Sequence, residues 1–295
     1  MALTGIQIFK MLPKTNCKEC GQPTCLAFAM NLAAGKAELS ACPYVSDEAR
    51  AMLSEASAPP IRPVTMGAGD NKVTVGGETV MFRHEKTFVN KPGIAVLISD
   101  AMAEDDVAGR IKRYNSLRYE WIGLLLRAEM IAIKNESNDA AKFESLVKRV
   151  MKETDAIPVL ISDNADALKA ALAVSAERVP LIYAATEQNY EAMVGLAKEF
   201  KCPLVAKSDN LNSLSELTDK IVAAGLKDII IDSGARGVKR AFEEMTFLRR
   251  AALIQKNRSL GFSPIVFPGE MTNNPLKETI IASMFIAKYA GIIVL

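Results

Sequence analysis

The chain has 295 residues, of which 49% are apolar and 24% are charged, and its formal net charge is +2. This composition is typical of a globular protein with a large core, and the balanced charge gives no reason to expect nucleic acid or an acidic membrane surface as a partner. The start lacks the apolar run of a signal peptide and no stretch of about 18 uncharged apolar residues occurs, so we expect a cytoplasmic protein without a membrane span.

Residues 1–57 predict a small, mainly helical domain. Thr4 can cap a short helix that Pro13 ends, and the small apolar residues of 23–39 predict a second helix. Ser46 precedes a third helical stretch that has two acidic residues in its first turn, where they complement the helix dipole.

A change of composition follows this domain. Three prolines within residues 58–64 indicate a boundary, and we place a Pro/Gly-rich linker at 58–71. Residues 72–82 carry alternating β-formers on both sides of Gly76 and Gly77, which predicts a hairpin.

From residue 93 onward, short apolar runs alternate with helical patterns. The runs are rich in β-branched residues and most end in a polar or glycine loop. They cover residues 93–100, 130–137, 157–164, 179–186, 202–209, 228–234, 263–269 and 291–295. The clearest helical pattern between them places apolar side chains on one face at Phe143, Leu146, Val147, Val150 and Met151.

This alternation predicts an α/β fold in which residues 72–295 form a (β/α)₈ TIM barrel, with the hairpin at its N-terminal end. A doubly wound open sheet is the alternative, but it would need a glycine-rich phosphate turn after the first strand, and "LISDAMAEDD" is not one. The chain stops inside the predicted eighth strand, so we expect it to be a fragment of a longer protein.

Four of the five cysteines lie near the N-terminus, as Cys17, Cys20, Cys25 and Cys42, in the pattern C-x₂-C-x₄-C-x₁₆-C-P. Disulfides are rare in a reducing cytosol, so clustered thiols indicate metal ligands or redox groups. Structural zinc sites usually come as two C-x₂-C pairs, and three clustered ligands with one remote Cys-Pro are closer to an iron–sulfur cluster. The pattern favours [4Fe–4S], and zinc or free thiols remain alternatives.

Other residues have more ordinary interpretations. Cys202 predicts a small buried hydrophobic residue, and Trp121 with the leucines after it predicts core or interface. Arg236 lies in "SGARGVKR", which is more typical of a plain βα turn than of an anion site. Polar residues also follow several strands, at Asp100, Asn135, Asp163, Asn189, Asp209, Asn210 and Asn273.

The stretch "LTGIQIFKMLPKTNCKECGQPTCLAFAMNLAAGKAELSACPYVS" closely resembles the large (gamma) subunits of the corrinoid/iron–sulfur proteins of the reductive acetyl-CoA pathway. The resemblance continues through "FRHEKTF", "PLIYAATEQNYEAM", "DKIVAAG", "NPLKE" and "AKYAGIIVL", and so covers essentially the whole chain.

The resemblance implies that Cys17, Cys20, Cys25 and Cys42 hold a [4Fe–4S] cluster ahead of a central barrel. It further implies a C-terminal corrinoid (cobalamin) domain, which this chain lacks. The expected partners are the small subunit, a methyltetrahydrofolate:corrinoid methyltransferase, acetyl-CoA synthase and an electron donor such as ferredoxin. The expected role of the cluster is to return oxidised Co(II) to Co(I), which accepts the methyl group.

Two other functions remain open from the residues alone. The barrel could bind a methylated pterin directly, through Asp163, Asn189 and Asp209, and act as a methyltransferase. The four cysteines could instead hold zinc in a docking module. If the chain is part of an enzyme, a corrinoid-dependent methyltransferase is the expected class.

Overall fold

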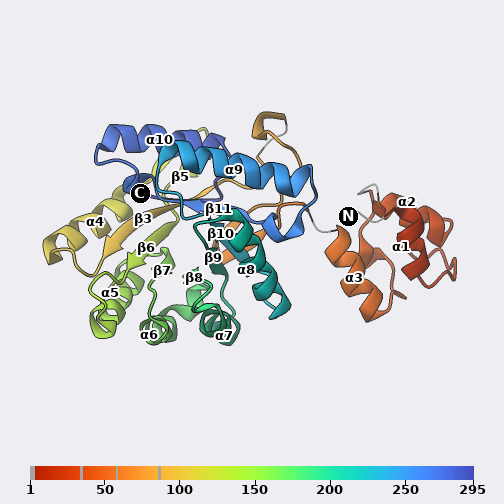
Figure 1. Cartoon of the computed structure of the whole chain (residues 1–295), viewed down its shortest axis with the longest axis horizontal. Helices are drawn as coiled ribbons and strands as arrows, with labels where there is room; N and C mark the ends of the chain where they lie inside the picture. The colour runs from red at the N-terminus through yellow and green to blue at the C-terminus, as the bar shows by residue number, and fades with distance from the viewer. Residues whose placement is uncertain (1–3, 34–35, 58, 86–87) are drawn as a thin grey trace. The chain divides into compact units, whose positions relative to one another are not determined.

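The computed structural model describes residues 4–33, 36–57, 59–85 and 88–295, and divides into two compact units, Met1–Pro60 and Ile61–Leu295. The chain runs through both units in order, from the N-terminal helices to the barrel (Figure 1). Within the described residues, no helix is both long enough and apolar enough to cross a membrane.

In its described residues, the N-terminal unit contains three α-helices: α1 (Gly5–Met11), α2 (Cys25–Ala33) and α3 (Asp47–Ser57). Thr4 caps α1 as predicted, in a capping box in which its side chain accepts from the backbone N–H of Gln7 and its own N–H is bound by the Gln7 side chain. The helices enclose one small apolar cluster, whose largest fully buried members are Phe28 and Leu53.

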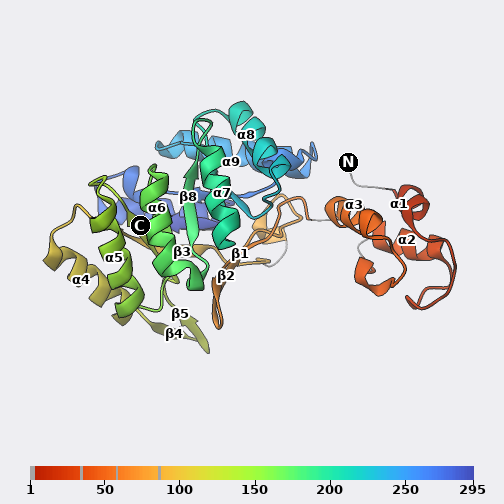
Figure 2. The ribbon, with the colours of Figure 1, turned by 90° about the horizontal axis from the view of Figure 1, so that it is seen from below.

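The second unit is a closed barrel of eight parallel strands (Figures 1 and 2). The strands are β3 (Gly93–Ser99), β6 (Met130–Lys134), β7 (Ile157–Ile161), β8 (Leu181–Ala185), β9 (Leu204–Lys207), β10 (Ile229–Asp232), β11 (Ser263–Val266) and β12 (Ile292–Val294). They pair in chain order and β12 closes the barrel on β3. Each lies within a predicted run, so the predicted TIM barrel is confirmed.

Seven helices surround the strands in the described part of the chain. They are α4 (Glu104–Ser116), α5 (Ala140–Glu153), α6 (Ala165–Ser175), α7 (Tyr190–Phe200), α8 (Leu211–Ala223), α9 (Val238–Leu253) and α10 (Pro275–Ala287). Short 3₁₀ turns occupy Leu39–Ala41, Arg83–Glu85, Ala176–Arg178, Arg258–Leu260 and Pro268–Glu270.

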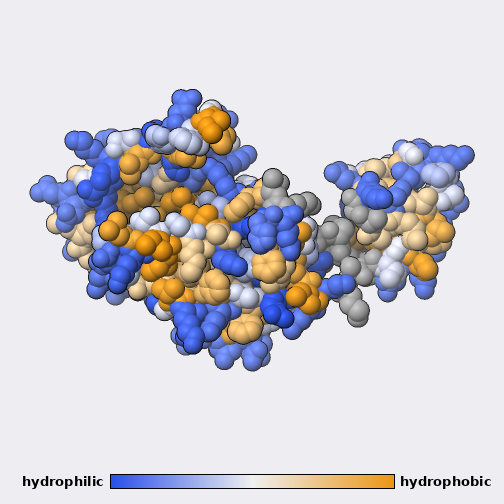
Figure 3. All heavy atoms as spheres, turned by 90° about the horizontal axis from the view of Figure 1, so that it is seen from above, coloured by the Kyte–Doolittle hydropathy of each residue, from blue (hydrophilic) through white to orange (hydrophobic). Residues whose placement is uncertain are grey.

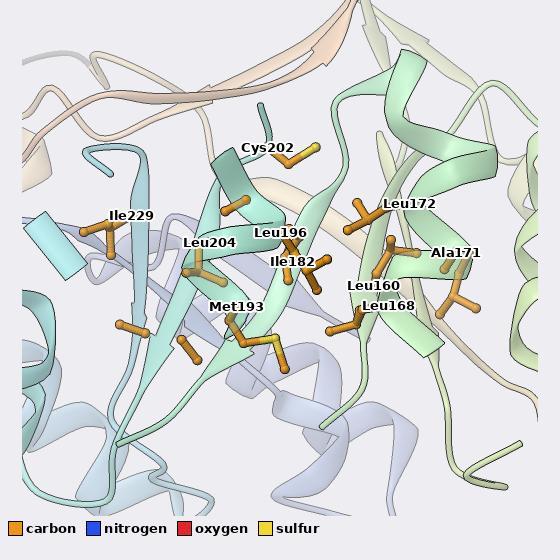
Figure 4. Close-up of a cluster of buried hydrophobic side chains, with 14 of the residues drawn as sticks. Leu160, Leu168, Ala171, Leu172, Ile182, Met193, Leu196, Cys202, Leu204 and Ile229 are labelled. Carbon is orange, nitrogen blue, oxygen red and sulfur yellow. The ribbon is translucent and has the colours of Figure 1, made fainter. Parts of the chain in front are cut away.

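Successive side chains of each strand enter two different apolar clusters. In β7 and β8, Val159 and Tyr183 point into the barrel, whereas Leu160 and Ile182 point outward. The outward side chains pack against Leu168, Leu172 and other residues of α6 and α7 (Figure 4). This double burial explains why the strand sequences are almost continuously apolar.

The N-terminal end of the barrel is covered by a hairpin, β1 (Val64–Ala68) and β2 (Asn71–Val75), whose buried side chains belong to the same cluster as the barrel interior. The prediction of a hairpin at 72–82 and of a linker through 71 was wrong in position. The turn is Gly69-Asp70, and Gly69 at φ +59° supplies the left-handed conformation that a two-residue turn needs.

Gly76 and Gly77, which suggested the misplaced turn, instead let two backbones approach closely. Both have positive φ angles, and a Cβ on Gly76 would lie 2.2 Å from the carbonyl oxygen of Arg62. The Gly77 N–H donates to the Ile61 carbonyl at 2.8 Å. At this glycine pair the chain therefore runs beside residues 61–62 and does not form a hairpin turn.

A second hairpin, β4 (Tyr119–Trp121) and β5 (Leu124–Leu126), follows α4. Trp121 and the following leucines were predicted as core or interface, and the core alternative is wrong, because Trp121 is 54% exposed and Ile122 at the turn is 84% exposed. Ile122 and Gly123 both have positive φ, which makes a tight turn that leaves the strands paired only with each other. Exposed apolar side chains are visible among hydrophilic ones on the barrel unit (Figure 3).

Candidate metal site and barrel mouth

The loop that carries the first cysteines is tightly wound. Lys14, Asn16 and Lys18 have positive φ angles of 60°, 48° and 67°, and Gly21 has 76°. Alternation of left-handed and ordinary residues turns successive backbone N–H groups toward one side, which is the arrangement that binds anions and many iron–sulfur centres.

Asn16 fastens this loop to the start of α2. Its side-chain Oδ1 accepts from the Cys25 N–H at 2.8 Å, and its own backbone N–H donates to Cys25 Sγ at 3.4 Å. An N–H donor to sulfur stabilises the thiolate and, in a bound cluster, raises the reduction potential. Sequence reasoning did not find Asn16, although its place directly before Cys17 was a usable signal.

The fourth cysteine approaches the loop from the other end of the unit. Cys25 and Cys42 are both buried in the N-terminal apolar cluster, while Cys20 is half-buried and Cys17 is exposed. Tyr44 Oη donates to Glu19 Oε1 at 2.8 Å, and so ties the segment after Cys42 to the loop between Cys17 and Cys20. The same hydrogen bond raises the pKa of the Tyr44 phenol.

All four thiols are free and belong to one small unit. In the described part of the chain, however, no three Cys, His, Asp or Glu side chains lie close enough together to hold a metal ion. The donor set nevertheless fits a thiolate-bound centre, since it offers four sulfur ligands and one backbone N–H, that of Asn16, which donates to Cys25 Sγ. Binding would have to draw Cys17 and Cys20 toward the buried pair.

The second candidate site is a cavity of about 360 Å³ at the C-terminal ends of the barrel strands. This is the end at which barrel enzymes place their active sites. Asp163 and Asp209, which were predicted as possible ligand-binding residues, line the cavity, and so does Asn135. Asn189 does not line it, and its Oδ1 accepts from the N–H of Thr186 at 2.7 Å.

One wall of the cavity is a closed ionic network. Tyr183 Oη donates to Asp232 Oδ2 at 2.6 Å, and Arg236 donates to both groups at 2.9 Å. Arg236 also pairs with Glu270 and lies 4.6 Å from the Phe267 ring centre. Burial opposes the charge on Arg236, but the hydrogen bonds to Asp232 outweigh it and raise its pKa, while burial raises the pKa of Tyr183. The charge of Arg236 is therefore matched internally, as expected for a structural βα turn.

Two polar residues of the cavity lining, Asn135 and Lys207, are not matched in the same way. Asn135 Nδ2 donates to Ser162 Oγ at 3.0 Å, but Oδ1 of Asn135 is buried without a hydrogen-bond partner in the described structure. Lys207 lies 5.8 Å from the Tyr183 ring centre and forms no ion pair with any described residue. The sequence did not identify Lys207 as a cavity residue. It is the last residue of β9, and the side of the sheet on which its side chain lies depends on how that strand pairs with its neighbours.

The remaining cysteine behaves as predicted. Cys202 is 1% exposed and packs with the side chains between β8, β9 and α7 (Figure 4). Burial raises the pKa of its thiol to about 12, so it stays protonated and unreactive at neutral pH.

Comparison with known proteins decides the family. The model of the CdhD family, described as CO dehydrogenase/acetyl-CoA synthase delta subunit, matches residues 63–295. The chain belongs to this family. A second family model, FeS, whose description names an Fe–S cluster, matches residues 12–44, a span that contains all four N-terminal cysteines.

The chain is also similar over its full length to larger proteins. It is 46% identical to the corrinoid/iron-sulfur protein large subunit of Moorella thermoacetica, across 100% of this chain and 66% of that protein. It is 34% identical to the acetyl-CoA decarbonylase/synthase complex subunit gamma 1 of Methanosarcina mazei, across 98% of this chain and 65% of that protein. The predicted resemblance is thus confirmed, and the chain spans slightly less than two thirds of these relatives.

Among solved structures, dihydropteroate synthase from Thermus thermophilus is similar in fold. The TM-score is 0.52 at 12% sequence identity, with coverage of 78% of this chain and 92% of that one. A structure of the synthase from Xanthomonas albilineans gives 0.50 at 12% identity, with coverage of 79% and 92%. Identity this low supports the barrel fold alone.

Proposed function

We propose that Cys17, Cys20, Cys25 and Cys42 bind a [4Fe–4S] cluster, and that the chain is the cluster-and-barrel part of a corrinoid/iron–sulfur methyl carrier. The observation that carries this proposal is the match of two family models in the same order as the two units, FeS over 12–44 and CdhD over 63–295. The full-length similarity to the Moorella large subunit supports the same assignment.

The cluster would supply one electron at low potential. In a methyl carrier, cobalt accepts the methyl group as Co(I), and occasional oxidation to Co(II) stops transfer until one electron returns. Iron–sulfur clusters cover roughly −700 to +450 mV, so a cluster can be tuned to this task. The corrinoid itself would be bound by the further third of length that the relatives possess.

We propose that residues 1–57 form the cluster domain and are joined to the barrel by residues 58–60, because Ile61 and Arg62 already pack within the barrel unit. Pro59 and Pro60 favour an extended connection, which can let a small electron-transfer domain reach a donor or acceptor. Reduced thiols are maintained in the cytosol, which is the compartment we propose.

The partners would be a small subunit, a methyltetrahydrofolate:corrinoid methyltransferase, acetyl-CoA synthase and a donor such as ferredoxin. Support for protein partners comes from the names of the relatives, which are subunits, and from the exposed β4–β5 hairpin. Tyr119, Trp121 and Leu124 expose 60%, 54% and 64% of their surface, and exposed apolar clusters often mark protein interfaces. A variant that carries both Trp121→Ser and Leu124→Ser should be recovered with less of the small subunit when the two are purified together.

The test is purification under anaerobic conditions, followed by assay of iron, zinc and acid-labile sulfide and an EPR spectrum after strong reduction. The proposal predicts iron and sulfide in equal amounts, about four of each per chain, and a reduced-cluster signal. Zinc without sulfide would instead support a structural docking module and would end the electron-transfer assignment.

A further inference from the structure

One residue that is not a cysteine is joined to a proposed ligand by two hydrogen bonds. Asn16 Oδ1 accepts from the backbone N–H of Cys25 at 2.8 Å, and the backbone N–H of Asn16 donates to Cys25 Sγ at 3.4 Å. The two bonds are reciprocal, as in a capping box, but they join residues that are nine positions apart. We call this pair of hydrogen bonds the Asn16–Cys25 clasp.

The clasp lies at the N-terminus of α2. Cys25 is the first residue of this helix, so its N–H has no acceptor within the helix. Thr24 Oγ1 accepts from the Ala27 N–H at 3.1 Å, and the Asn16 side chain accepts the Cys25 N–H from outside the helix. Cys25 is also buried in the apolar cluster of the N-terminal unit. The backbone and the sulfur of Cys25 are therefore both held in place by this chain's own residues.

The four sulfurs differ in their hydrogen bonds. Within the residues that the structure describes, Cys25 Sγ accepts from a backbone N–H, whereas the sulfurs of Cys17, Cys20 and Cys42 have no such donor. A donor to sulfur stabilises negative charge there, and reduction of an iron–sulfur cluster adds one negative charge. The clasp therefore favours the reduced state of a cluster bound at Cys25.

The backbone conformation restricts which residue can stand at position 16. Asn16 has a φ of +48°, in the left-handed region that Gly, Asn and Asp adopt most readily. Glycine has no side-chain acceptor for the Cys25 N–H. Aspartate has one, but its negative charge would oppose further negative charge on a cluster beside it. Asparagine is the residue of the three that supplies an uncharged acceptor.

We propose that Asn16 is a positioning residue that sets the reduction potential of the cluster. Its side chain holds the Cys25 N–H, which keeps its own backbone N–H on Cys25 Sγ, and this donor raises the potential. The inference rests on the proposed cluster and adds a residue that is not a ligand. The electron equilibrium between the cluster and its redox partners then depends on the Asn16 side chain.

A redox titration followed by EPR, on the anaerobically purified full chain and on Asn16→Gly, tests the proposal. Glycine adopts the left-handed conformation without strain and keeps the backbone N–H, so this change removes only the side-chain acceptor. Asn16→Gly should retain the iron and sulfide of the unsubstituted chain. Its midpoint potential should fall by about 59 mV, which is a tenfold change in a one-electron equilibrium and corresponds to one lost hydrogen bond.

Two further variants separate geometry from charge. Asn138→Gly is the matched control, because Asn138 also has a left-handed φ, of +55°, but belongs to the barrel unit; it should leave the potential unchanged. Asn16→Asp keeps the acceptor and the backbone conformation and adds an exposed carboxylate. It should retain iron and lower the potential by an amount that shrinks as salt is added, whereas the shift in Asn16→Gly should not depend on salt.

An unchanged or raised midpoint potential in an Asn16→Gly chain with full iron content would overturn the proposal. If Asn16→Gly loses its iron, Asn16→Asp decides the matter. Retained iron with a lowered potential supports the clasp, whereas loss of iron from both variants would make Asn16 a structural residue of the loop and overturn its role in setting the potential. Failure of the cluster assignment is distinguishable, because zinc without sulfide would already be found in the unsubstituted chain and would overturn both proposals.

Discussion

The two units of the molecule differ in how far function and stability share the same residues. The N-terminal unit has one small apolar cluster, and two of its buried members, Cys25 and Cys42, are proposed metal ligands. The barrel unit has extensive apolar clusters inside and outside its strands, and the polar residues that line its mouth cavity, such as Asn135 and Asp209, belong to none of these clusters. Domains of about 60 residues often need a metal or disulfides, whereas large barrels do not. We therefore expect cluster loss to unfold one unit and spare the other.

The largest effect is expected from Cys42→Ala. This change removes a proposed ligand and a buried side chain together, so the chain should lose its iron and the N-terminal unit should unfold. Hydrogen exchange followed by mass spectrometry should show fast exchange in the N-terminal peptides and unchanged protection in β6 and β7. Cys202→Ala is the matched control, because Cys202 is equally buried and should retain full iron. Iron retention by Cys42→Ala would contradict the ligand assignment.

Equal truncations in the two cores should have unequal consequences. Phe28 and Phe143 are at most 1% exposed, and Phe→Ala at either position should cost about 3–5 kcal/mol. Phe28→Ala should unfold the N-terminal unit, whereas Phe143→Ala should lower the Tm of a barrel that remains folded at 25 °C. Thermal unfolding with exchange protection of each unit measures both. An N-terminal unit that stays protected in Phe28→Ala would show that its core is stronger than we infer.

A smaller loss of unfolding free energy is expected from a substitution at a buried charged residue of the barrel. Glu78 accepts a hydrogen bond from Arg83 at 2.9 Å and forms an ion pair with Arg249 at 3.1 Å, and all three side chains are at most 5% exposed. Glu78→Ala leaves two buried guanidinium groups without this counter-ion and should lower the free energy of unfolding by about 3 kcal/mol. Denaturant titration measures the change.

Glu104→Ala is the control for that titration, because Glu104 is 81% exposed in its pair with Arg149. It should change the free energy of unfolding by less than about 1 kcal/mol. Equal effects of the two substitutions would mean that the buried pair is hydrated in solution.

The smallest effect concerns acid stability. Burial opposes ionisation of Asp155, but hydrogen bonds from Arg127 and Arg118 outweigh it and lower its pKa from the ordinary 3.8. A lowered folded-state pKa contributes stability at higher pH, and this contribution is lost as the pH falls below about 4. Asp155→Asn should cost under about 1 kcal/mol at pH 7, since Asp155 is 45% exposed, and its deficit relative to the native chain should shrink toward pH 3. If the stability lost in Asp155→Asn does not change with pH, the lowered pKa of Asp155 is not its cause.

Features that repeat along the chain could be predicted from the sequence. The eight strands are buried on both faces and read as apolar runs, and the buried face of α5 follows the helical period from Phe143 to Val150. The cysteine spacing and the family resemblance were equally local signals. Thr4 needed only its neighbour Gln7 to be recognised as a cap.

Features that depend on distant contacts could not be predicted. Gly76 and Gly77 suggested a turn, but their conformation serves a close approach to residues 61–62. The leucines near Trp121 have a core-like composition, and only the tertiary structure shows that nothing in the described chain covers them. Asn135, which follows β6, and Lys207, at the end of β9, line the same cavity, and no spacing along the chain connects them.

Native mass spectrometry of the anaerobically purified chain tests the central claim most directly, because it weighs protein and bound metal together. The account predicts one dominant species whose added mass equals four iron and four sulfide ions, and its loss in Cys42→Ala but not in Cys202→Ala. A species carrying one zinc ion, or an iron–sulfur mass that survives in Cys42→Ala, would contradict the claim that these four thiols hold an electron-transfer cluster.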